Sequence, residues 1–436
     1  MPCYRLSPQM YSLWTSCLGK KLLSHGMCRN LCNIQRSPVI SCSSGFLVKD
    51  ISKLSYRSER YVSSLPHVSS GGNVDVSLES AQNIGQLVLP RPSVSSGEAL
   101  SNVPSNGRVM LIDGTAIIYR AYYKLLAKLH HGYLSHADGN GDWVMTIFAA
   151  LSLIIDVLEL IPSHVAVVFD HIGNSFRETS NTSKDIMFKG MNFRHNMYSA
   201  YKSNRGPTPD TVVQGLQYLK ASIKAMAIEV IEVPGVEADD VIGTLALRSV
   251  NDGFKVRVVS PDKDFFQILS PSLRLLRIAP RGDEMSSFGL EEFAAKYGTL
   301  EPSQFVDIVA LIGDKSDNIP GVTGVGEVHA VRLITEYGSL ENLLSNVDKV
   351  QQDHIREALK ANQHLARLSR ELAMLRTDLP PYIVPFDTTN LIFRKPEDNG
   401  EKFTSLLNAI SAYAEGFSAD PVIRRAFYLW KKLEKQ

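Results

Sequence analysis

Three short apolar segments of the chain each lead to an aspartate, and this pattern limits the possible folds more than any other feature. The segments are residues 109–112 before Asp113, residues 165–169 before Asp170 and residues 256–260 before Asp262. Helical patterns separate them, for example at residues 144–160 and 239–250. Because strands that alternate with helices pair in parallel, we predict an α/β protein with a mostly parallel sheet. Beyond about residue 300, only short helical segments are predicted.

Further acidic residues accompany these three strand-end aspartates. The nine candidate carboxylates are Asp113, Asp170, Glu237, Asp239, Asp240, Asp262, Asp264, Asp314 and Asp317. Parallel strands present their carboxyl ends at one edge of the sheet, where ligands bind, so we expect these groups to converge. Converging carboxylates repel one another unless cations lie between them, and oxygen ligands alone favour Mg²⁺ or Mn²⁺ over zinc. Solvated surface acids would explain any one pair, but not so many acids directly after apolar strands.

Composition excludes several kinds of protein. All five cysteines lie within the first 42 residues, so neither disulfides nor Cys-ligated zinc can stabilise the remainder. The longest apolar stretch, residues 147–155, is too short for a membrane span of about 20 residues, and we predict no membrane association. No Walker-type phosphate-binding motif is present, which argues against nucleotide hydrolysis.

Net charge does not by itself point to a nucleic-acid partner. The whole chain carries a formal charge of +1, and residues 106–436 contain 36 Lys or Arg against 40 Asp or Glu. If bound cations neutralise the nine candidate acids, 36 basic residues face 31 acidic ones. A phosphate backbone is then a plausible partner.

The first 105 residues have the composition of a leader followed by a linker. No acid precedes Asp50, while Arg, Lys, Ser and Leu recur, as is typical of organelle transit peptides. We predict a transit peptide over residues 1–62; an amphipathic segment at 10–23 favours the mitochondrion, with the chloroplast as the alternative. An ordinary disordered N-terminus is the competing interpretation. Residues 63–105 are rich in Ser, Gly, Asn and Pro and predict a disordered linker.

Two further segments have the composition of phosphate-binding elements. Residues 193–205 interleave Arg and Lys with aromatic residues, a combination that contacts phosphates and stacks on bases, although basic faces are more often simply solvated. Residues 319–327 place turn-forming glycines before a helix predicted to begin near Val325. Backbone N–H groups at such a helix start can face a phosphate.

Together these motifs resemble the 5′-nuclease (flap endonuclease) superfamily, in particular the 5′–3′ exonuclease domain of bacterial DNA polymerase I. The similarity runs from residue 106 to about residue 380. The strings that carry it are Leu111-Ile-Asp113-Gly-Thr, Tyr119-Arg120-Ala-Tyr, Phe169-Asp170, Phe193-Arg-His, Tyr201-Lys202-Ser-Asn-Arg205, Val236-Glu-Ala-Asp-Asp-Val, Asp262-Lys-Asp264 and Gly313-Asp-Lys-Ser-Asp-Asn-Ile-Pro-Gly-Val. The leader and the C-terminal tail resemble those of stand-alone plant organellar members.

The resemblance implies an architecture and a set of site residues. It implies a PIN-like nuclease domain over residues 106–300 with a helical arch around 190–226, an all-helical helix–three-turn–helix DNA-binding domain over 301–390, and a helical extension over 391–436. The nine carboxylates would surround two or three Mg²⁺ or Mn²⁺ ions. The implied catalytic cations are Arg194, Lys202 and Arg205, and the implied DNA-binding residues are Tyr119, Arg120, Tyr201, Lys263, Gly321, Gly324 and Gly326. The glycine hairpin often holds K⁺ as well.

The chain departs from the family pattern at two places. Phe176-Arg177 and Phe193-Arg194 both match the family's Phe-Arg pair; we prefer Arg194, because Tyr201-Lys202 follows it in register, and this makes residues 171–192 an insertion. Val328 stands where the family often has Lys, so one phosphate contact is expected to be missing.

The predicted function is that of a metal-dependent 5′–3′ exonuclease and structure-specific flap endonuclease. It would act as a monomer on DNA with 5′ flaps, nicks or RNA primers, in organelle DNA replication and repair. One alternative is an inactive module that binds nicked DNA, which the intact acid set disfavours. Another is a PIN-type RNase, which the glycine hairpin disfavours. The balance of exonuclease and flap cleavage, and the preference for RNA or DNA 5′ ends, stay open.

Overall fold

The computed structural model describes residues 107–132, 141–171, 192–279 and 284–435. The predicted transit peptide, the predicted linker and residues 172–191 of the insertion lie outside these ranges, as do all five cysteines. Within the described ranges, no helix is both long and apolar enough to cross a membrane.

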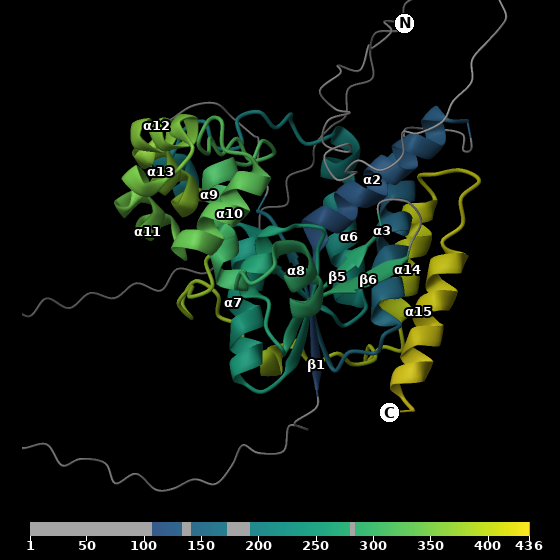
Figure 1. Cartoon of the computed structure of the whole chain (residues 1–436). Coiled ribbons are helices and arrows are strands. Elements are labelled where there is room, and N and C mark those ends of the chain that lie inside the picture. Colours follow the sequence, from purple (N-terminus) through teal and green to yellow (C-terminus); the bar gives the residue numbers. More distant parts are fainter. Residues whose placement is uncertain (1–106, 133–140, 172–191, 280–283, 436) are drawn as a thin grey trace, which may run out of the picture. The chain divides into compact units, whose positions relative to one another are not determined.

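A six-stranded sheet forms the centre of the nuclease region (Figure 1). Its strands are β1 (Arg108–Asp113), β2 (His164–Phe169), β3 (Glu229–Glu232), β4 (Lys255–Val259), β5 (Leu273–Ile278) and β6 (Met285–Phe288). The order across the sheet is β3-β2-β1-β4-β5-β6, and only β6 runs antiparallel to its neighbour among these strands. The prediction of a mostly parallel α/β sheet is confirmed. The strand order reverses between β1 and β4, and ligands bind at such a switch point, outside the carboxyl ends of the strands.

The central strand β1 is buried on both faces, so its side chains alternate between two apolar layers. Val109 and Leu111 pack into the layer that contains α7 (Ala238–Asn251), whereas Met110 and Ile112 pack into the opposite layer. That second layer includes α2 (Gly114–His130), α3 (Asp142–Leu158) and α6 (Asp210–Ala225). Figure 1 shows these three helices on the opposite side of the sheet from α7. Both layers hold the strand ends rigidly in place.

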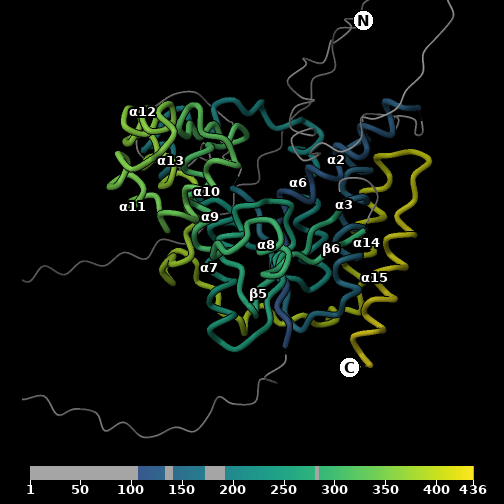
Figure 2. The backbone as a smooth tube through the Cα atoms, viewed as in Figure 1, coloured from purple at the N-terminus to yellow at the C-terminus, as the bar shows by residue number. Residues whose placement is uncertain are grey.

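Residues after β6 are helical, as predicted. The helices are α8 (Leu290–Tyr297), α9 (Phe305–Ile312), α10 (Glu327–Tyr337), α11 (Leu340–Ser345), α12 (Asp353–Ala361) and α13 (Gln363–Ala373), with short 3₁₀ turns η4 (Pro302–Gln304) and η5 (Val347–Lys349). In Figure 2, α9 to α13 gather beside α7. Their apolar residues continue the same buried layer that contains α7, so this helical region is packed onto the nuclease region without a break in the core.

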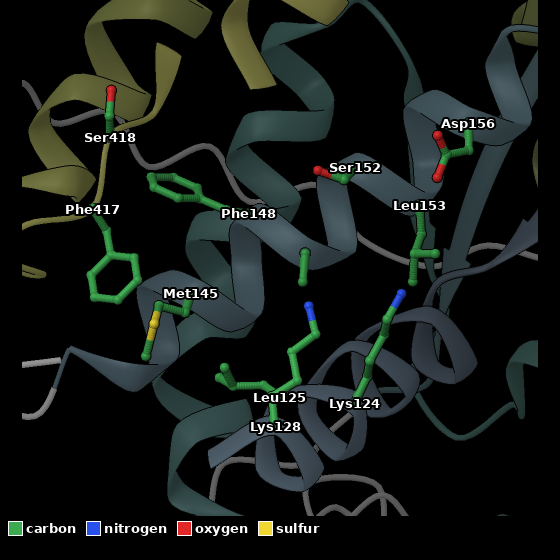
Figure 3. Close-up of a pocket in the computed structure, with 11 residues that line it drawn as sticks. Lys124, Leu125, Lys128, Met145, Phe148, Ser152, Leu153, Asp156, Phe417 and Ser418 are labelled. Carbon is green, nitrogen blue, oxygen red and sulfur yellow. The ribbon is translucent and has the colours of Figure 1, made fainter. Parts of the chain in front are cut away.

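The C-terminal extension covers the other side of the nuclease region. After η6 (Thr388–Leu391), helices α14 (Glu401–Ser411) and α15 (Asp420–Leu433) bury Phe403, Leu407 and Trp430 in the layer of α3 and α6. A cavity of about 310 Å³ remains where the turn before α15 meets α2 and α3 (Figure 3). Lys124, Lys128, Phe148 and Phe417 are among its lining residues, and none of the nine candidate acids lines it.

The predicted arch is shorter in the structure than the range 190–226. Helix α5 (Phe193–Met197) and the turns over residues 198–205 precede α6, which buries Val212, Leu216 and Leu219 against α3. Helix α6 therefore belongs to the body of the nuclease region. Among the described residues before α6, the segment 192–205 contacts the acids at the edge of the sheet.

Candidate active site

The strand-end aspartates follow three neighbouring strands. Asp113 ends β1, Asp170 comes directly after β2, and Asp262 comes three residues after β4. Asp113 also accepts the Ala116 N–H at 2.8 Å and the Ser260 hydroxyl at 2.9 Å, so one carboxylate caps α2 and contacts the segment after β4. Since β2, β1 and β4 are adjacent, the switch point of the sheet brings these three acids together as predicted.

Helix α7 adds its acids to this edge through a contact with Asp170. The Ala238 N–H, at the first turn of α7, donates to Asp170 Oδ1 at 2.8 Å. A carboxylate at a helix N-terminus also interacts favourably with the helix dipole. This contact places Glu237, the N-cap of α7, and Asp239, in its first turn, beside the strand ends.

A second group of acids combines the loop that follows α9 with the turn that follows β4. The Ser316 backbone N–H donates to Asp314 Oδ1 at 2.7 Å, and the Asp314 and Ile319 backbones pair with each other. Asp262 Oδ1 accepts the Asp264 N–H at 2.9 Å, which holds these two carboxylates in one turn. The charges of Asp314 and Asp317 act on Asp262 and Asp264. These four acids therefore form a second group next to the first.

Burial, and after it the charges of the two groups, raises the pKa of Asp113, Asp239 and Asp264. Burial, followed by the neighbouring charges of Asp170 and Asp262, raises the pKa of Asp113 to about 7 against the opposing Ala116 and Ser260 hydrogen bonds. Burial and the charges of Asp262, Asp113 and Asp170 raise the pKa of Asp239 well above its ordinary value. The pKa of Asp264 is raised in the same way by burial and then by Asp262, Asp317 and Asp314. Asp262 therefore belongs to both groups.

Lys202 and Arg205 lie among these acids. Lys202 forms an ion pair with Glu237 and approaches Asp317 Oδ2 at 3.6 Å, and Arg205 pairs with the other Asp317 oxygen. Burial disfavours the charged form of Glu237, but Lys202 and Arg194 outweigh it and lower the pKa of Glu237 to about 2. Burial likewise opposes charge on Lys202, yet Glu237 and Asp317 raise its pKa, so it stays cationic.

Backbone contacts dock this cationic turn onto the second acid group. The Lys202 N–H donates to the Asp317 carbonyl oxygen at 2.9 Å, and Asn318 Nδ2 donates to the Ala200 carbonyl oxygen at 2.6 Å. Asn204 Nδ2 donates to the Lys315 carbonyl oxygen at 2.5 Å. Sequence reasoning did not assign a role to Asn204 or Asn318, nor to Ser260, which joins Asp113 to the Asp262 backbone. Asn204 and Asn318 stand within the matching strings, whereas Ser260 stands outside them, at the end of the apolar segment 256–260.

Arg194 and Asp240 lie elsewhere than their predicted roles require. Arg194 was expected to be a catalytic cation, but its side chain is 4% exposed and binds Asp240 with both terminal nitrogens, at 2.7 and 2.9 Å. Asp240 was expected to ligate an ion, but it is 1% exposed and engaged with Arg194 and the Arg376 N–H. Glu237 and Asp240 lie on one side of the start of α7, because Arg194 contacts both.

The predicted DNA-binding side chains divide into accessible and buried ones. Lys263 is exposed beside Asp262, and Tyr119 is half-buried on α2, where its hydroxyl contacts Thr208. Arg120 donates to the Ala279 carbonyl oxygen. Tyr201 differs from the prediction, because it is 3% exposed and its hydroxyl donates to Glu237 and Asp317. Tyr201 therefore holds Glu237 and Asp317 in place, and its buried ring offers no surface on which a DNA base could stack.

The glycine hairpin contains glycines of two kinds. Gly321 is buried at φ +66°, its N–H donates to Ser369 Oγ at 2.9 Å, and a Cβ there would lie 2.4 Å from the Gly313 backbone nitrogen. Gly321 therefore allows its backbone to pass close to that of Gly313, and it does not make the predicted phosphate contact. Gly324, at φ +92°, and Gly326, the N-cap of α10, are exposed with open space where a Cβ would lie. Val328 projects beside them and is 82% exposed.

The donor set fits hard divalent cations. Asp113, Asp170, Asp239, Asp262, Asp264, Asp314 and Asp317 offer carboxylate oxygens only, which suits Mg²⁺ or Mn²⁺. Burial and the neighbouring carboxylates raise the pKa of Asp113, Asp239 and Asp264, and a bound cation would offset this crowding of negative charge. Within the described ranges, no three Asp, Glu, His or Cys side chains are placed to enclose one ion together. Lys202 and Arg205 occupy the space among the acids instead.

Two family models match the chain in succession. Residues 108–298 match the 5′–3′ exonuclease, N-terminal resolvase-like domain, and residues 300–399 match the 5′–3′ exonuclease, C-terminal SAM fold. The chain therefore belongs to the 5′–3′ exonuclease family, a class of hydrolases that act on DNA. The resemblance inferred from the motifs is confirmed.

The curated relatives are much longer proteins. The thermostable DNA polymerase I of Thermus filiformis is 38% identical over 273 residues, which cover 63% of this chain and 29% of the polymerase. DNA polymerase I of Mycobacterium bovis is 35% identical over 299 residues, which cover 68% of this chain and 30% of the polymerase. The chain thus spans less than one third of these relatives. A solved structure of the T5 D15 protein, co-crystallized with metal ions, is 20% identical with a TM-score of 0.48 over 70% of this chain and 99% of its own.

The raised pKa values lead to a prediction about stability in the absence of metal. A carboxyl whose pKa rises from 3.8 to about 7 on folding stabilises the fold below pH 3.8 and loses that contribution as the pH rises through 7. Asp113→Asn keeps the helix cap, so at pH 8 in EDTA it should raise the melting temperature by several degrees, since the shift corresponds to at most about 4 kcal/mol. Mg²⁺ should raise the melting temperature of the unmodified protein more at pH 8 than at pH 6, because fewer protons compete.

Thermal unfolding at both pH values measures these effects. Asp210→Asn, at an exposed helix start away from the acids, is the matched control and should change the melting temperature by less than about 1 °C. A lower melting temperature for Asp113→Asn at pH 8 would show that repulsion among the acids is not what limits stability.

Proposed function

We propose that this protein is a divalent-metal-dependent 5′–3′ exonuclease and flap endonuclease that hydrolyses phosphodiester bonds near DNA 5′ ends. The observation that carries the proposal is the meeting of two acid groups with Lys202 and Arg205 at the switch point of the sheet. Membership of the 5′–3′ exonuclease family supports the same reaction.

The residues of the site divide the chemistry between them. The first group, Asp113, Asp170 and Asp239, and the second group, Asp264, Asp314 and Asp317, would each hold cations, with Asp262 between the groups. When bound, Mg²⁺ or Mn²⁺ ions supply Lewis acidity and a lowered pKa for the attacking water. Lys202 and Arg205 would release Glu237 and Asp317 and turn to the phosphate, where their charges stabilise the negative charge of the transition state.

The glycine hairpin would bind the duplex backbone away from the chemistry. The first N–H groups of α10 lack a side-chain cap at Gly326, and a phosphate is a suitable acceptor for them. Gly324→Val should weaken duplex binding several-fold, because its φ of +92° disfavours a β-branched residue and the new side chain occupies the open approach. Val328→Lys should do the reverse and strengthen binding by about 1 kcal/mol or less at low salt.

Fluorescence anisotropy with a labelled duplex at two salt concentrations checks both hairpin variants. The salt slope should steepen by about one unit for Val328→Lys, because one more phosphate is neutralised. Equal affinities of the unmodified protein, Gly324→Val and Val328→Lys for the duplex would show that the hairpin does not bind DNA.

One assay tests the activity as a whole. 5′-labelled flap, nicked and RNA-primed duplexes, and a single-stranded RNA of the same sequence, are incubated with the protein in Mg²⁺ or EDTA. Mg²⁺-dependent release of short 5′ products from the duplexes supports the proposal. Binding without cleavage would indicate an inactive DNA-binding module, and cleavage confined to the single-stranded RNA would indicate a PIN-type RNase. The product lengths also separate exonuclease from flap cleavage.

We further propose an organellar role, in trimming flaps or RNA primers during DNA replication and repair. The acid-free start of the sequence supports it. Residues 1–105 fused to a fluorescent protein should enter mitochondria, with plastids as the alternative destination. Fusion of residues 106–436 is the control and should stay outside both organelles. A cytosolic or nuclear signal from the 1–105 fusion would contradict the leader.

A further inference from the structure

We propose that Arg194 and Asp240 form a buried clamp that positions Glu237 and Asp239 at the start of α7 and touches neither metal nor phosphate. The inference rests on the proposed metal-dependent function and goes beyond it. It assigns two residues of the family motifs to a positioning role, and it joins the base of the arch to the segment that follows α13.

Every N–H donor of Arg194 is already used. Its Nε donates to the Leu372 carbonyl oxygen at 2.9 Å, and Nη2 donates to the Met374 carbonyl oxygen at 2.8 Å. The other three donors go to carboxylates: Nη1 to Glu237 Oε2 at 2.8 Å and Asp240 Oδ2 at 2.7 Å, and Nη2 to Asp240 Oδ1 at 2.9 Å. A guanidinium has five N–H donors, so none is left for a phosphate.

Asp240 is equally occupied, in contrast to the residue before it. Asp240 Oδ1 accepts both from Arg194 and from the Arg376 N–H at 2.9 Å, and its side chain is 2% exposed. Asp239 instead lies close enough to Asp262, Asp113 and Asp170 for their charges to act on it. Successive residues of a helix point about 100° apart, so α7 directs Asp239 to the ions and Asp240 to the clamp.

The clamp belongs to a longer contact along α7. Residues 374–386, which we call the strap, run from α13 along one face of this helix. Thr244 Oγ1 accepts the Leu379 N–H at 3.4 Å, and Arg248 donates to the carbonyl oxygens of Val384 and Phe386. Asp240, Thr244 and Arg248 are spaced four residues apart, so one polar stripe of α7 holds the whole strap.

The position of the clamp at the first turn of α7 gives it a function that the rest of the strap lacks. Arg194 contacts Glu237 directly, and Glu237 is the residue that holds Lys202. The guanidinium groups of Arg194 and Arg376 both lie over the Phe193 ring, at 4.6 and 4.7 Å from its centroid, and these contacts stabilise the junction. Losing the fork at Arg194 should therefore loosen Glu237 and Asp239, whereas losing Arg248 should loosen only the far end of the strap.

Titration of the full-length chain with Mn²⁺ alone, followed by electron paramagnetic resonance, distinguishes clamp from ligand. Asp239→Asn and Asp240→Asn remove the same charge from adjacent residues. Asp239→Asn should lose one bound ion or more than about 100-fold in affinity. Asp240→Asn should keep the number of ions of the unmodified protein and lose only about 10-fold, as positioning residues around metal sites do. Equal losses in both variants would make Asp240 a ligand and overturn the proposal.

A second pair of variants tests positioning without any change of charge. Arg194→Lys keeps the cation but not the five-donor fork, so it should weaken Mn²⁺ binding about 10-fold and slow single-turnover cleavage of a saturated flap by a similar factor. Arg248→Lys, the same substitution at the far end of the strap, should leave both values within about twofold. Unchanged Mn²⁺ binding in Arg194→Lys, or an equal loss in Arg248→Lys, would overturn the clamp. If the unmodified protein binds no Mn²⁺, the proposed function itself fails.

Discussion

Asp262→Asn should abolish detectable cleavage while duplex binding stays within a few-fold of that of the unmodified protein. Asp262 is the acid that both groups share, because its charge acts on Asp113 and Asp239 on one side and on Asp264 on the other. Its loss removes an oxygen ligand and one negative charge from the centre of the site. Metal ions contribute several kcal/mol to stabilising charge in the transition state, so the rate should fall at least about 10³-fold. Single-turnover cleavage of a 5′ flap in Mg²⁺ measures the rate, and fluorescence anisotropy in Ca²⁺ measures binding.

Asp252→Asn is the matched control for this substitution. Asp252 follows the last residue of α7, whereas Asp239 lies in the first turn of that helix. Asp252 accepts a hydrogen bond from Thr388, which is not one of the site residues. The control should cleave at nearly the rate of the unmodified protein. Full Mg²⁺-dependent activity in Asp262→Asn would contradict the assignment of the strand-end acids as metal ligands, at any activity of Asp252→Asn.

Lys202→Ala should lower the single-turnover rate by roughly 10²–10³ and weaken flap binding much less. Lys202 is held at the acids by Glu237 and Asp317, and its backbone is fixed to the Asp317 carbonyl oxygen. The charge therefore lies beside the acids, from where it would turn to a bound phosphate and contribute more to the transition state than to the ground state. Quench-flow kinetics at saturating protein give the rate, and a separate titration gives the dissociation constant.

Two comparisons make the Lys202 result specific. Lys224→Ala, exposed at the end of α6, should change neither constant by more than about twofold. Gly324→Val should show the opposite division, with weaker binding and a nearly unchanged rate from the saturated complex. If Lys202→Ala loses only affinity and Gly324→Val loses only rate, the arch and the hairpin have been assigned the wrong way round.

The strand-end acids illustrate what a sequence pattern can predict. Asp113, Asp170 and Asp262 follow apolar segments, and parallel strands present their carboxyl ends at one edge, so their convergence needed no knowledge of distant contacts. The family motifs likewise located Lys202 and Arg205 beside the acids. Strands β3, β5 and β6 were not predicted, because short segments carry weak periodic signals. The packing of α14 against α6 and of α15 against α3 was not predicted either, because it depends on contacts between distant segments.

The sequence by itself determined the parallel sheet, the acidic edge and the helical region that follows, because each depends on local apolar patterns and on chain direction. Only the tertiary structure decided what the neighbours Asp239 and Asp240 do. The charges of the strand-end acids act on Asp239, whereas Asp240 binds Arg194, 46 residues away, and Arg376, 136 residues away. It also decided that Tyr201 and Gly321 are buried supports and that α6 belongs to the body. A motif specifies which side chains are present, whereas the burial and hydrogen bonds of each depend on elements that fold back from far along the chain.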